Sequence, residues 1–131
     1  MIFLDGRRAE YWRRVFAYLG EHKDAKVLDV ACGFGKFAHL FKPENYMGID
    51  FSEEMIKLAK EKNPGYAFFV MDYKDDILRD QFDLVFEINS LRSLGLNYYD
   101  FIERSRELIN DGGAIFIGEC DEWITYRKQK Y

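Results

Sequence analysis

The sequence has few of the residues that build disulfide frameworks and metal sites. Two cysteines and two histidines are scattered among its 131 residues, so we expect neither a disulfide framework nor a bound metal. No apolar run is long enough to span a bilayer, and the opening MIFLDGRR lacks the order of regions found in a signal peptide. These absences predict a cytoplasmic protein with no membrane partner.

An excess of positive charge is also lacking. The formal net charge is -4 and the isoelectric point is about 5.2, and a protein that binds nucleic acid through its phosphates usually carries a basic surface. The basic residues that cluster near both ends are interpreted as solvated faces rather than a phosphate site. Nucleic acid is therefore not the expected partner.

What the sequence does contain is an alternation of short apolar runs and helical patterns. With 48% hydrophobic residues, the chain should fold as one domain over residues 1–131, with an N-terminal helix region at 1–25, a core at 26–119 and a tail at 120–131. Alternating strands and helices predict a three-layer α/β sandwich with a mainly parallel sheet of about five strands. The five runs span residues 26–30, 46–49, 67–71, 82–88 and 114–118.

Three helices are expected from the spacing of apolar side chains. They cover residues 8–19, 53–62 and 98–109, with Ser52 as the N-cap of the second and residues 110–113 as a turn after the third. The runs VLDVA, DLVFEI and AIFIG are almost continuously apolar, which is typical of strands buried on both faces. They are predicted to be the central strands.

The segment VLDVACGFGKF carries the chemistry. It reads as a strand, a tight turn with Gly33 and Gly35, and a helix starting near Lys36, an arrangement that lets backbone N–H groups approach a ligand. Its pattern DxAxGxG is neither the dinucleotide fingerprint nor the nucleotide-triphosphate loop. Because Asp29 would repel phosphate, the segment favours a cationic ligand.

This segment resembles the first motif of class I S-adenosylmethionine-dependent methyltransferases, with Ala31 in place of the first glycine. Four later segments resemble further motifs of that Rossmann-like family in the same order, so the likeness covers residues 27–119. It implies S-adenosyl-L-methionine as cofactor and S-adenosyl-L-homocysteine as product. The four segments are YMGIDFSEEMI, FFVMDYKDD, FDLVFEINSLRSL and ELINDGGAIFIGE.

The resemblance implies roles for individual residues. Asp29 would accept from the cofactor ammonium group or hold the loop, and Asp50 would accept from the ribose hydroxyls or, alternatively, cap the next helix. Asp72 would take the adenine amino group, with Asp75 and Asp76 as competing candidates. The implied cofactor-binding set is Tyr11, Asp29, Ala31, Cys32, Gly33, Phe34, Gly35, Asp50, Phe51, Met55, Met71, Asp72, Tyr73, Glu87 and Ile88.

The same resemblance places Glu87 and Asn89 beside the reacting centre. Glu87 would take a proton or neutralise the cofactor charge, and Asn89 would accept from the nucleophile, although both are equally consistent with ordinary polarity of a cleft wall. Asn89-Ser90-Leu91-Arg92 departs from the motif of DNA amino-methyltransferases, which favours a small-molecule methyl acceptor. Tyr11 would touch the cofactor or substrate, or be a core aromatic.

The end of the sequence departs from the family pattern. The family adds a helix and two strands after the fifth strand, whereas residues 121–131 leave room for little. Residues 114–118 would then form an exposed sheet edge, which predicts a homodimer, a partner subunit or a tail folded over the edge. The alternatives to an enzyme of O, N or C methylation are a catalytically silent cofactor-binding module completed by a partner chain, and a shortened form of a larger enzyme.

Overall fold

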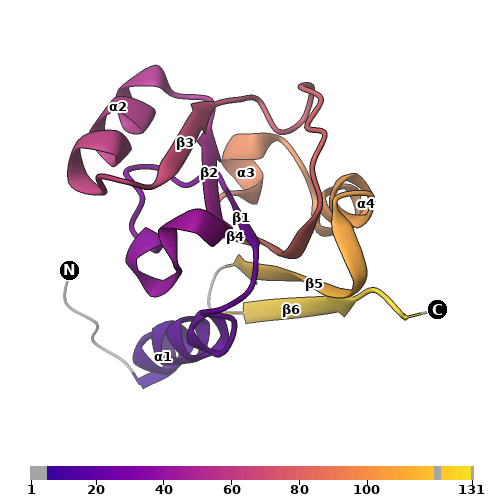
Figure 1. The fold of residues 1–131 in the computed structure, drawn as a ribbon. Helices are drawn as coiled ribbons and strands as arrows, with labels where there is room; N and C mark the ends of the chain where they lie inside the picture. The colour runs from indigo at the N-terminus through magenta and orange to yellow at the C-terminus, as the bar shows by residue number, and fades with distance from the viewer. Residues whose placement is uncertain (1–5, 120–121, 131) are drawn as a thin grey trace.

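The computed structural model describes residues 6–119 and 122–130, and Figure 1 shows their arrangement. Helices and strands alternate along the chain, as the sequence predicts. In chain order the elements are α1 (Gly6–Glu21), β1 (Val27–Val30), the 3-10 helices η1 (Ala38–Leu40) and η2 (Pro43–Asn45), β2 (Tyr46–Asp50), α2 (Glu53–Lys62), β3 (Ala67–Val70), β4 (Phe82–Ile88), α3 (Leu91–Leu94), α4 (Tyr98–Arg106), β5 (Ile109–Glu119) and β6 (Glu122–Arg127).

The strands form one sheet in the order β3-β2-β1-β4-β5-β6. The pairs from β3 to β5 are parallel, and β6 runs antiparallel to β5. All four residues of β1 are buried, as are most of β4 and β5, because these apolar runs are covered by helices on both faces. The prediction of an α/β fold with these three central strands is confirmed.

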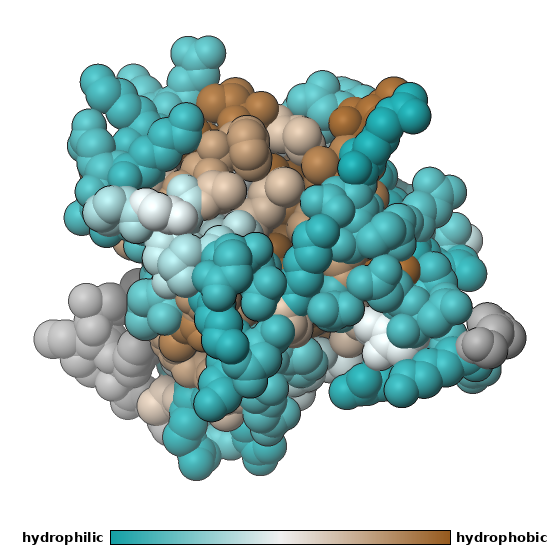
Figure 2. All heavy atoms as spheres, viewed as in Figure 1, coloured by the Kyte–Doolittle hydropathy of each residue, from teal (hydrophilic) through white to brown (hydrophobic). Residues whose placement is uncertain are grey.

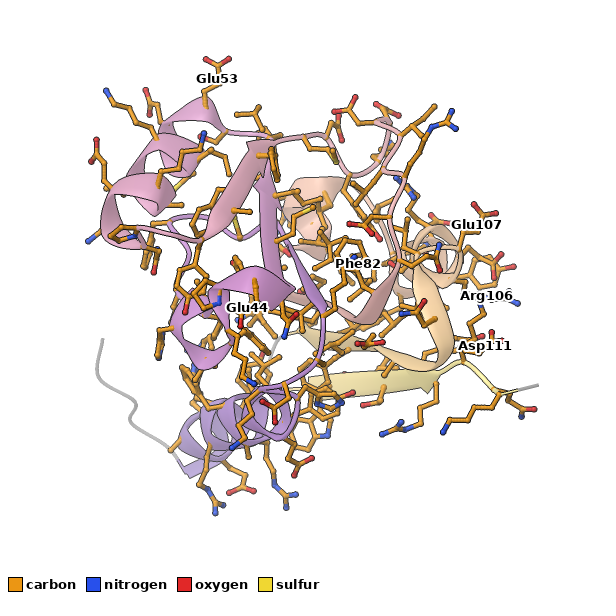
Figure 3. All side chains as sticks on the ribbon, in the orientation of Figure 1. Glu44, Glu53, Phe82, Arg106, Glu107 and Asp111 are labelled. Atoms are coloured by element: carbon orange, nitrogen blue, oxygen red, sulfur yellow. The ribbon has the colours of Figure 1, made fainter. Side chains whose placement is uncertain are left out.

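Two apolar clusters lie on opposite faces of the sheet. Leu28 and Ile115 pack with α3 and α4, whereas their neighbours Val27 and Phe116 pack with α1, η1 and α2. This alternation follows from the two-residue repeat of a strand. In Figure 3 the charged side chains of Glu53 and Asp111 project outward, so the three layers are apolar inside and charged outside.

The predicted C-terminal tail contributes a sixth strand. Residues 122–127 read EWITYR, a run of aromatic and β-branched side chains that suits a strand, and they pair with β5 from Ala114↔Arg127 to Glu119↔Glu122. The prediction that residues 114–118 form the exposed edge is therefore wrong, because β6 covers them. Of the three outcomes considered, a tail folded over the edge is the one found.

Two further boundaries differ from the predictions. The α4 helix ends at Arg106, and residues 110–113, expected as a turn, lie within β5, where Gly112 has φ of 81° and donates its N–H to the carbonyl oxygen of Lys128 at 2.8 Å. The helix expected from Lys36 is replaced by turns and η1. Pro43 follows so closely that it forces Lys42 into an extended conformation, which leaves too few residues for a stable helix.

The α2 helix spans the predicted residues, and the Ser52 hydroxyl accepts from the N–H of Met55 at 3.2 Å, which confirms the N-cap. The α1 helix extends the predicted range at both ends. None of the helices in the described part of the chain combines the length and apolar character needed to cross a membrane.

Candidate functional site

The carboxyl ends of the parallel strands meet at one edge of the sheet. The connections from β1 lead to β2 on one side, whereas β4 lies on the other side of β1, so the chain reverses its winding direction between β1 and β4. Open parallel sheets bind ligands in the crevice at such a point. The segments that follow the strands, 31–35, 51–52, 71–73 and 89–90, are thereby brought together, and we call this edge the crevice.

The loop after β1 has a strained backbone. Ala31 and Gly33 have positive φ values of 58° and 56°, and Gly35 has 83°. A side chain at Gly33 would meet nothing within 4 Å, so this backbone is open to a ligand. A Cβ at Gly35 would lie 2.5 Å from Asn63 Nδ2 and 2.9 Å from Phe68 Cζ. Gly35 is therefore required by packing against β3, which differs from the role expected of it.

Asp50 ties the two sides of the crevice together. Its Oδ2 accepts the N–H of Gly33 at 2.9 Å, and its Oδ1 accepts the N–H of Ser52 at 3.0 Å. Asp50 thus fixes Ser52, the N-cap residue of α2, whereas the capping bond to the helix, the alternative role considered for Asp50, comes from the Ser52 hydroxyl. Each oxygen has a second lone pair, so Asp50 retains the capacity to accept two hydroxyl donors.

Asp29 points into the core. It is 2% exposed, and its Oδ2 accepts from the Tyr46 hydroxyl at 2.6 Å. A Cβ at Gly48 would lie 2.8 Å from that hydroxyl, so the glycine makes room for the bond. Burial raises the pKa of Asp29 to about 7, opposed by the Tyr46 bond and assisted by the charge of Asp50. Asp29 therefore holds the loop by anchoring β1 to β2.

Apolar side chains flank the crevice. Phe34, Phe51 and Met55 are 42%, 59% and 38% exposed. In Figure 2, apolar residues gather where β3 ends and α2 begins, between teal surfaces formed by charged side chains. Exposed flat and flexible apolar groups at this position form a surface on which a planar ring can stack.

The residues after β3 divide between the crevice and the core. Asp72 is exposed, donates its N–H to Asp76 Oδ2 at 2.8 Å and accepts the N–H of Lys74 at 3.0 Å. Tyr73 is 1% exposed, and its hydroxyl bonds Ser105 of α4 at 2.6 Å. The Tyr73 side chain therefore packs beneath α4, and a contact of this residue with the cofactor through its backbone stays a prediction.

The side chain of Cys32 lies in the core. Its side chain is 7% exposed and its Sγ would lie 3.0 Å from a Cβ at Gly48, so the thiol packs between β1 and β2. Burial raises the pKa of this thiol well above its ordinary value. Cys32 contributes to the loop through its backbone, whose N–H donates to the carbonyl oxygen of Ile49 at 2.9 Å.

The end of β4 carries a buried polar cluster. Glu87 is fully buried, and its Oε1 accepts from the N–H and hydroxyl of Ser90 at 2.8 and 2.9 Å. Burial and the adjacent Glu119 carboxyl raise the pKa of Glu87 to about 9, so Glu87 is protonated at neutral pH. The other carboxyl oxygen of Glu87, Oε2, is buried and has no hydrogen-bond partner among the described residues, so protonation avoids burying an unpaired charge there.

Asn89 links the same cluster to α1. It adopts φ of 57°, donates its N–H to the carbonyl oxygen of Gly118 at 2.7 Å and accepts from the Tyr11 hydroxyl through Oδ1 at 3.2 Å. Tyr11 is only 2% exposed, so its buried side chain connects α1 to Asn89 at the edge of the crevice. Of the two roles considered for Tyr11, the buried aromatic is the one that these contacts support. Ile88, between Glu87 and Asn89, is half-buried.

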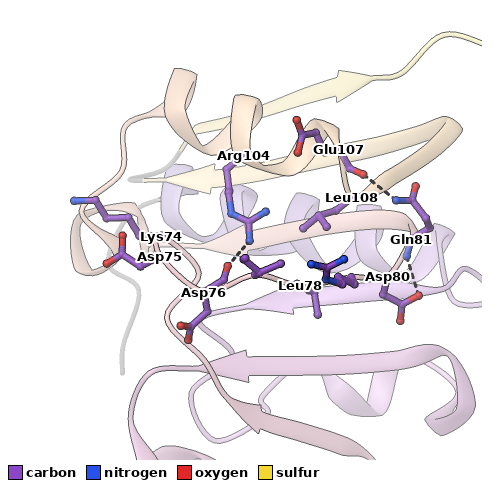
Figure 4. Close-up of a pocket in the computed structure, with 11 residues that line it drawn as sticks. Lys74, Asp75, Asp76, Leu78, Asp80, Gln81, Arg104, Glu107 and Leu108 are labelled. Atoms are coloured by element: carbon purple, nitrogen blue, oxygen red, sulfur yellow. Dashed lines mark hydrogen bonds between the residues drawn. The ribbon is translucent and has the colours of Figure 1, made fainter.

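A cavity of 670 Å³ lies away from the crevice, between the connection from β3 to β4 and the end of α4 (Figure 4). Arg104 crosses it and donates to the carbonyl oxygens of Tyr73 and Asp76. Its wall carries both basic and acidic side chains. Among residues 6–119 and 122–130, no group of three or more side chains is arranged to hold a metal ion.

A model of the family described as "Methyltransferase domain" matches residues 27–113. The chain belongs to the class I S-adenosylmethionine-dependent methyltransferase family. The prediction of S-adenosylmethionine as cofactor is thereby confirmed at the level of the family.

Curated relatives with different activities share this methyltransferase domain. The chain is 35% identical over 81 residues to cyclopropane-fatty-acyl-phospholipid synthase of Escherichia coli (strain K12), covering 57% of this chain and 20% of that protein. It is 35% identical over 135 positions to demethylmenaquinone methyltransferase of Staphylococcus aureus (strain JH9), covering 92% of this chain and 54% of that one. The chain thus spans between a fifth and about half of the length of these relatives.

Solved methyltransferase structures share the fold. A putative S-adenosylmethionine-dependent methyltransferase from Listeria monocytogenes superposes with a TM-score of 0.68 at 23% identity, over 84% of this chain and 54% of that one. An S-adenosylmethionine-dependent methyltransferase from Thiobacillus denitrificans, solved with S-adenosyl-L-homocysteine, gives 0.66 at 20% identity, over 81% of this chain and 48% of that one.

Three residues that shape the crevice were missed by the sequence reasoning. Tyr46 anchors Asp29, Ser90 holds Glu87, and Glu119 lies against Glu87. Glu119 carried a usable signal, since an acidic residue at the end of a buried apolar strand reaches the same edge as Glu87. Tyr46 and Ser90 carried none, because their roles depend on which strands are neighbours.

Proposed function

We propose that the chain binds S-adenosylmethionine in the crevice and transfers its methyl group to an oxygen, nitrogen or carbon of a small molecule. The observation that carries the proposal is the convergence of three features at one sheet edge. These are the open backbone at Gly33, the Asp50 carboxylate with unused lone pairs, and the exposed apolar pair Phe51 and Met55.

The residues fit the parts of the cofactor by their chemistry. Asp50 would accept the two ribose hydroxyls, as carboxylates at the end of a second strand do in related folds. Phe51 and Met55 would pack on the adenine ring, and Asp72 would accept from its amino group. The methionine end would lie along the backbone at Gly33, where no side chain intervenes.

The cofactor, when bound, supplies an activated methyl group on a sulfonium with a good leaving group. The protein's task is then alignment, because correct positioning alone removes a large part of the barrier of a two-reactant step. Asn89 and the Glu87 cluster lie at the end of β4, where an acceptor would enter, and Asn89 is held in place by Tyr11 and Gly118. These contacts support an acceptor site of fixed geometry.

A small-molecule acceptor agrees with the names of the relatives. Demethylmenaquinone methyltransferase and a sugar N-methyltransferase from Streptoalloteichus, which is 25% identical over 88% of this chain, are named for small acceptors. The net charge of -4 gives no general attraction for nucleic acid. Only the second of these names states an acceptor atom, so the proposal covers oxygen, nitrogen and carbon.

The first test is the affinity for cofactor and product, measured by calorimetry. Asp50→Asn keeps the shape of the side chain but replaces a charged acceptor, and we expect the Kd to rise at least about tenfold, since hydrogen bonds to charged groups contribute about 1.5–3 kcal/mol. Glu53→Gln, on the exposed first turn of α2, is the matched control and should leave the Kd unchanged. An Asp50→Asn variant with the wild-type Kd would contradict the site assignment.

Methyl transfer itself is tested separately, by measuring S-adenosyl-L-homocysteine formation with a panel of hydroxyl, amine and activated-carbon acceptors. Turnover above the rate without acceptor supports the proposal. Tight cofactor binding without turnover on any class of acceptor would contradict the enzymatic part while leaving the binding site in place.

A further inference from the structure

The outer edge of β6 is an unpaired strand with the features of a pairing surface. β6 is the last strand of the sheet, and among the described residues no strand lies on its other side (Figure 1). Natural edge strands are usually protected by a proline, a bulge or a central charge. β6 has none of these: it pairs with β5 without interruption, and its four central residues are Trp123, Ile124, Thr125 and Tyr126.

The hydrogen bonds of Lys128 show which backbone groups face outward. Its N–H donates to Gly113 and its carbonyl oxygen accepts from Gly112, so Lys128 faces β5. Because successive residues of an antiparallel strand alternate in direction, residues 126, 124 and 122 also face β5. The N–H and carbonyl groups of Trp123, Thr125 and Arg127 therefore point away from the sheet and are available to another strand.

The side chains of β6 are complementary to those of a second β6 in one register. A twofold axis perpendicular to the sheet keeps each face on the same side, so side chains that lie opposite each other must share a face. When the axis passes beside Thr125, Trp123 lies opposite Arg127 of the other copy, and Ile124 lies opposite Tyr126. Trp123 and Thr125 line the α1 face with Arg14 and Tyr18, and Tyr126 packs on the α4 face.

In this register the outward backbone groups find hydrogen-bond partners and charged side chains lie opposite charges of the other sign. All the outward groups of residues 123, 125 and 127 would bond, giving about six main-chain hydrogen bonds between the two strands. The Trp123–Arg127 pair is a cation–π combination, and Ile124–Tyr126 is an aliphatic–aromatic cross-strand pair of the kind that stabilises sheets. Glu122 comes opposite Lys128, so unlike charges meet at both ends of the paired segment.

We propose that β6 pairs antiparallel with β6 of a second copy of this chain, about a twofold axis at Thr125, and so joins two six-stranded sheets into one. The expected homodimer is retained, but its interface is the edge of β6 instead of β5. The crevice lies at the carboxyl ends of the parallel strands and does not take part, so this inference is independent of the proposed function.

The first experiment is light scattering coupled to size-exclusion chromatography with the full chain. Because an interface made by a single pair of strands is small, the dimer should be populated at about 200 µM and dissociate on dilution. The expected mass at high concentration is twice 15.6 kDa. A mass of 15.6 kDa at that concentration would overturn the proposal.

The twofold axis gives a sharper test, because Thr125 would lie opposite itself. Thr125→Lys and Thr125→Glu each place two like charges face to face, and each variant alone should raise the dimer Kd about tenfold or more. An equimolar mixture of the two should restore the dimer as a heterodimer. Thr125→Val, which keeps the N–H and the branched shape, is the matched control and should dimerise like the wild type.

The outcomes separate this register from other modes of association. Two results would refute the pairing about Thr125. The first is a dimer that persists in both charged variants. The second is a mixture that stays monomeric although each variant keeps the wild-type circular dichroism and melting temperature. Loss of cofactor binding in the Asp50→Asn variant with an intact dimer would concern only the crevice.

Discussion

The buried carboxyl of Asp29 makes the stability of this protein depend on pH in a way that a single substitution can isolate. Asp29 is 2% exposed, with its Oδ2 bonded to the Tyr46 hydroxyl. The substitution Asp29→Asn keeps the shape and an oxygen that can accept from Tyr46, but removes the titrating group. The difference in stability between the two proteins then reports the titration of Asp29 alone.

The magnitude follows from the pKa in the two states. Burial raises the pKa of Asp29 from 3.8 to about 7 in the folded protein. Between these values the folded state holds a proton that the unfolded state has lost, so the stability contributed by Asp29 is complete below pH 3.8 and is lost as the pH rises to about 7. A shift of about three pH units corresponds to about 4 kcal/mol in the free energy of unfolding.

The assay is urea unfolding of both proteins at intervals between about pH 4 and pH 8.5, with circular dichroism as the measured signal. The unfolding free energy of Asp29→Asn minus that of the wild type should rise by up to about 4 kcal/mol between pH 4 and 7 and stay constant above it. Glu87, whose pKa is also raised, is present in both proteins, so its contribution cancels. A difference that does not change with pH would refute the burial and protonation assigned to Asp29.

Two further predictions concern backbone geometry near the crevice. Ala31 has a φ of 58°, a conformation that costs a residue with a Cβ about 1 kcal/mol, so Ala31→Gly should raise the free energy of unfolding by up to about 1 kcal/mol in urea titrations; a loss of stability would show that the strain is absent. Gly48→Ala would place a Cβ 2.8 Å from both the Tyr46 hydroxyl and Phe68 Cδ1, and this crowding should lower the free energy of unfolding by about 1–3 kcal/mol. Gly65 has a positive φ and open space around it, so Gly65→Ala measures the cost of backbone strain without crowding. An unchanged melting temperature in Gly48→Ala would contradict the close packing around Asp29.

Local sequence determined the elements whose signal lies within a few residues. The alternation of apolar runs with helical spacing identified all five parallel strands, and the range of β4 agrees with the structure from Phe82 to Ile88. Ser52 and the two glutamates after it predicted the start of α2, because capping depends on groups three residues apart. The order of the motifs, through their resemblance to the methyltransferase family, led to the cofactor.

Contacts between elements distant in the chain decided where the side chains of the candidate site point. Whether Asp29 faces a ligand or the core depends on Tyr46, which reaches it only because β2 lies beside β1 with Gly48 between them. The Tyr73 hydroxyl forms a hydrogen bond with Ser105 of α4, and Asn89 accepts a hydrogen bond from Tyr11 of α1, which is 78 positions away in the chain. No local pattern encodes these pairs. The assigned roles of Asp50, Phe51, Met55 and Asp72 toward the cofactor stay predictions.

The sheet edge shows the same division. The apolar residues 114–118 were enough to predict a buried strand, since a continuously apolar run needs cover on both faces. They could not predict which strand lies beside it, because EWITYR has the composition of a strand whichever neighbour it pairs with. Strand propensity depends on adjacent residues, whereas the choice of a neighbouring strand depends on the positions of elements distant in the chain. Because β6 pairs with β5, the exposed edge of the sheet is β6 instead of β5.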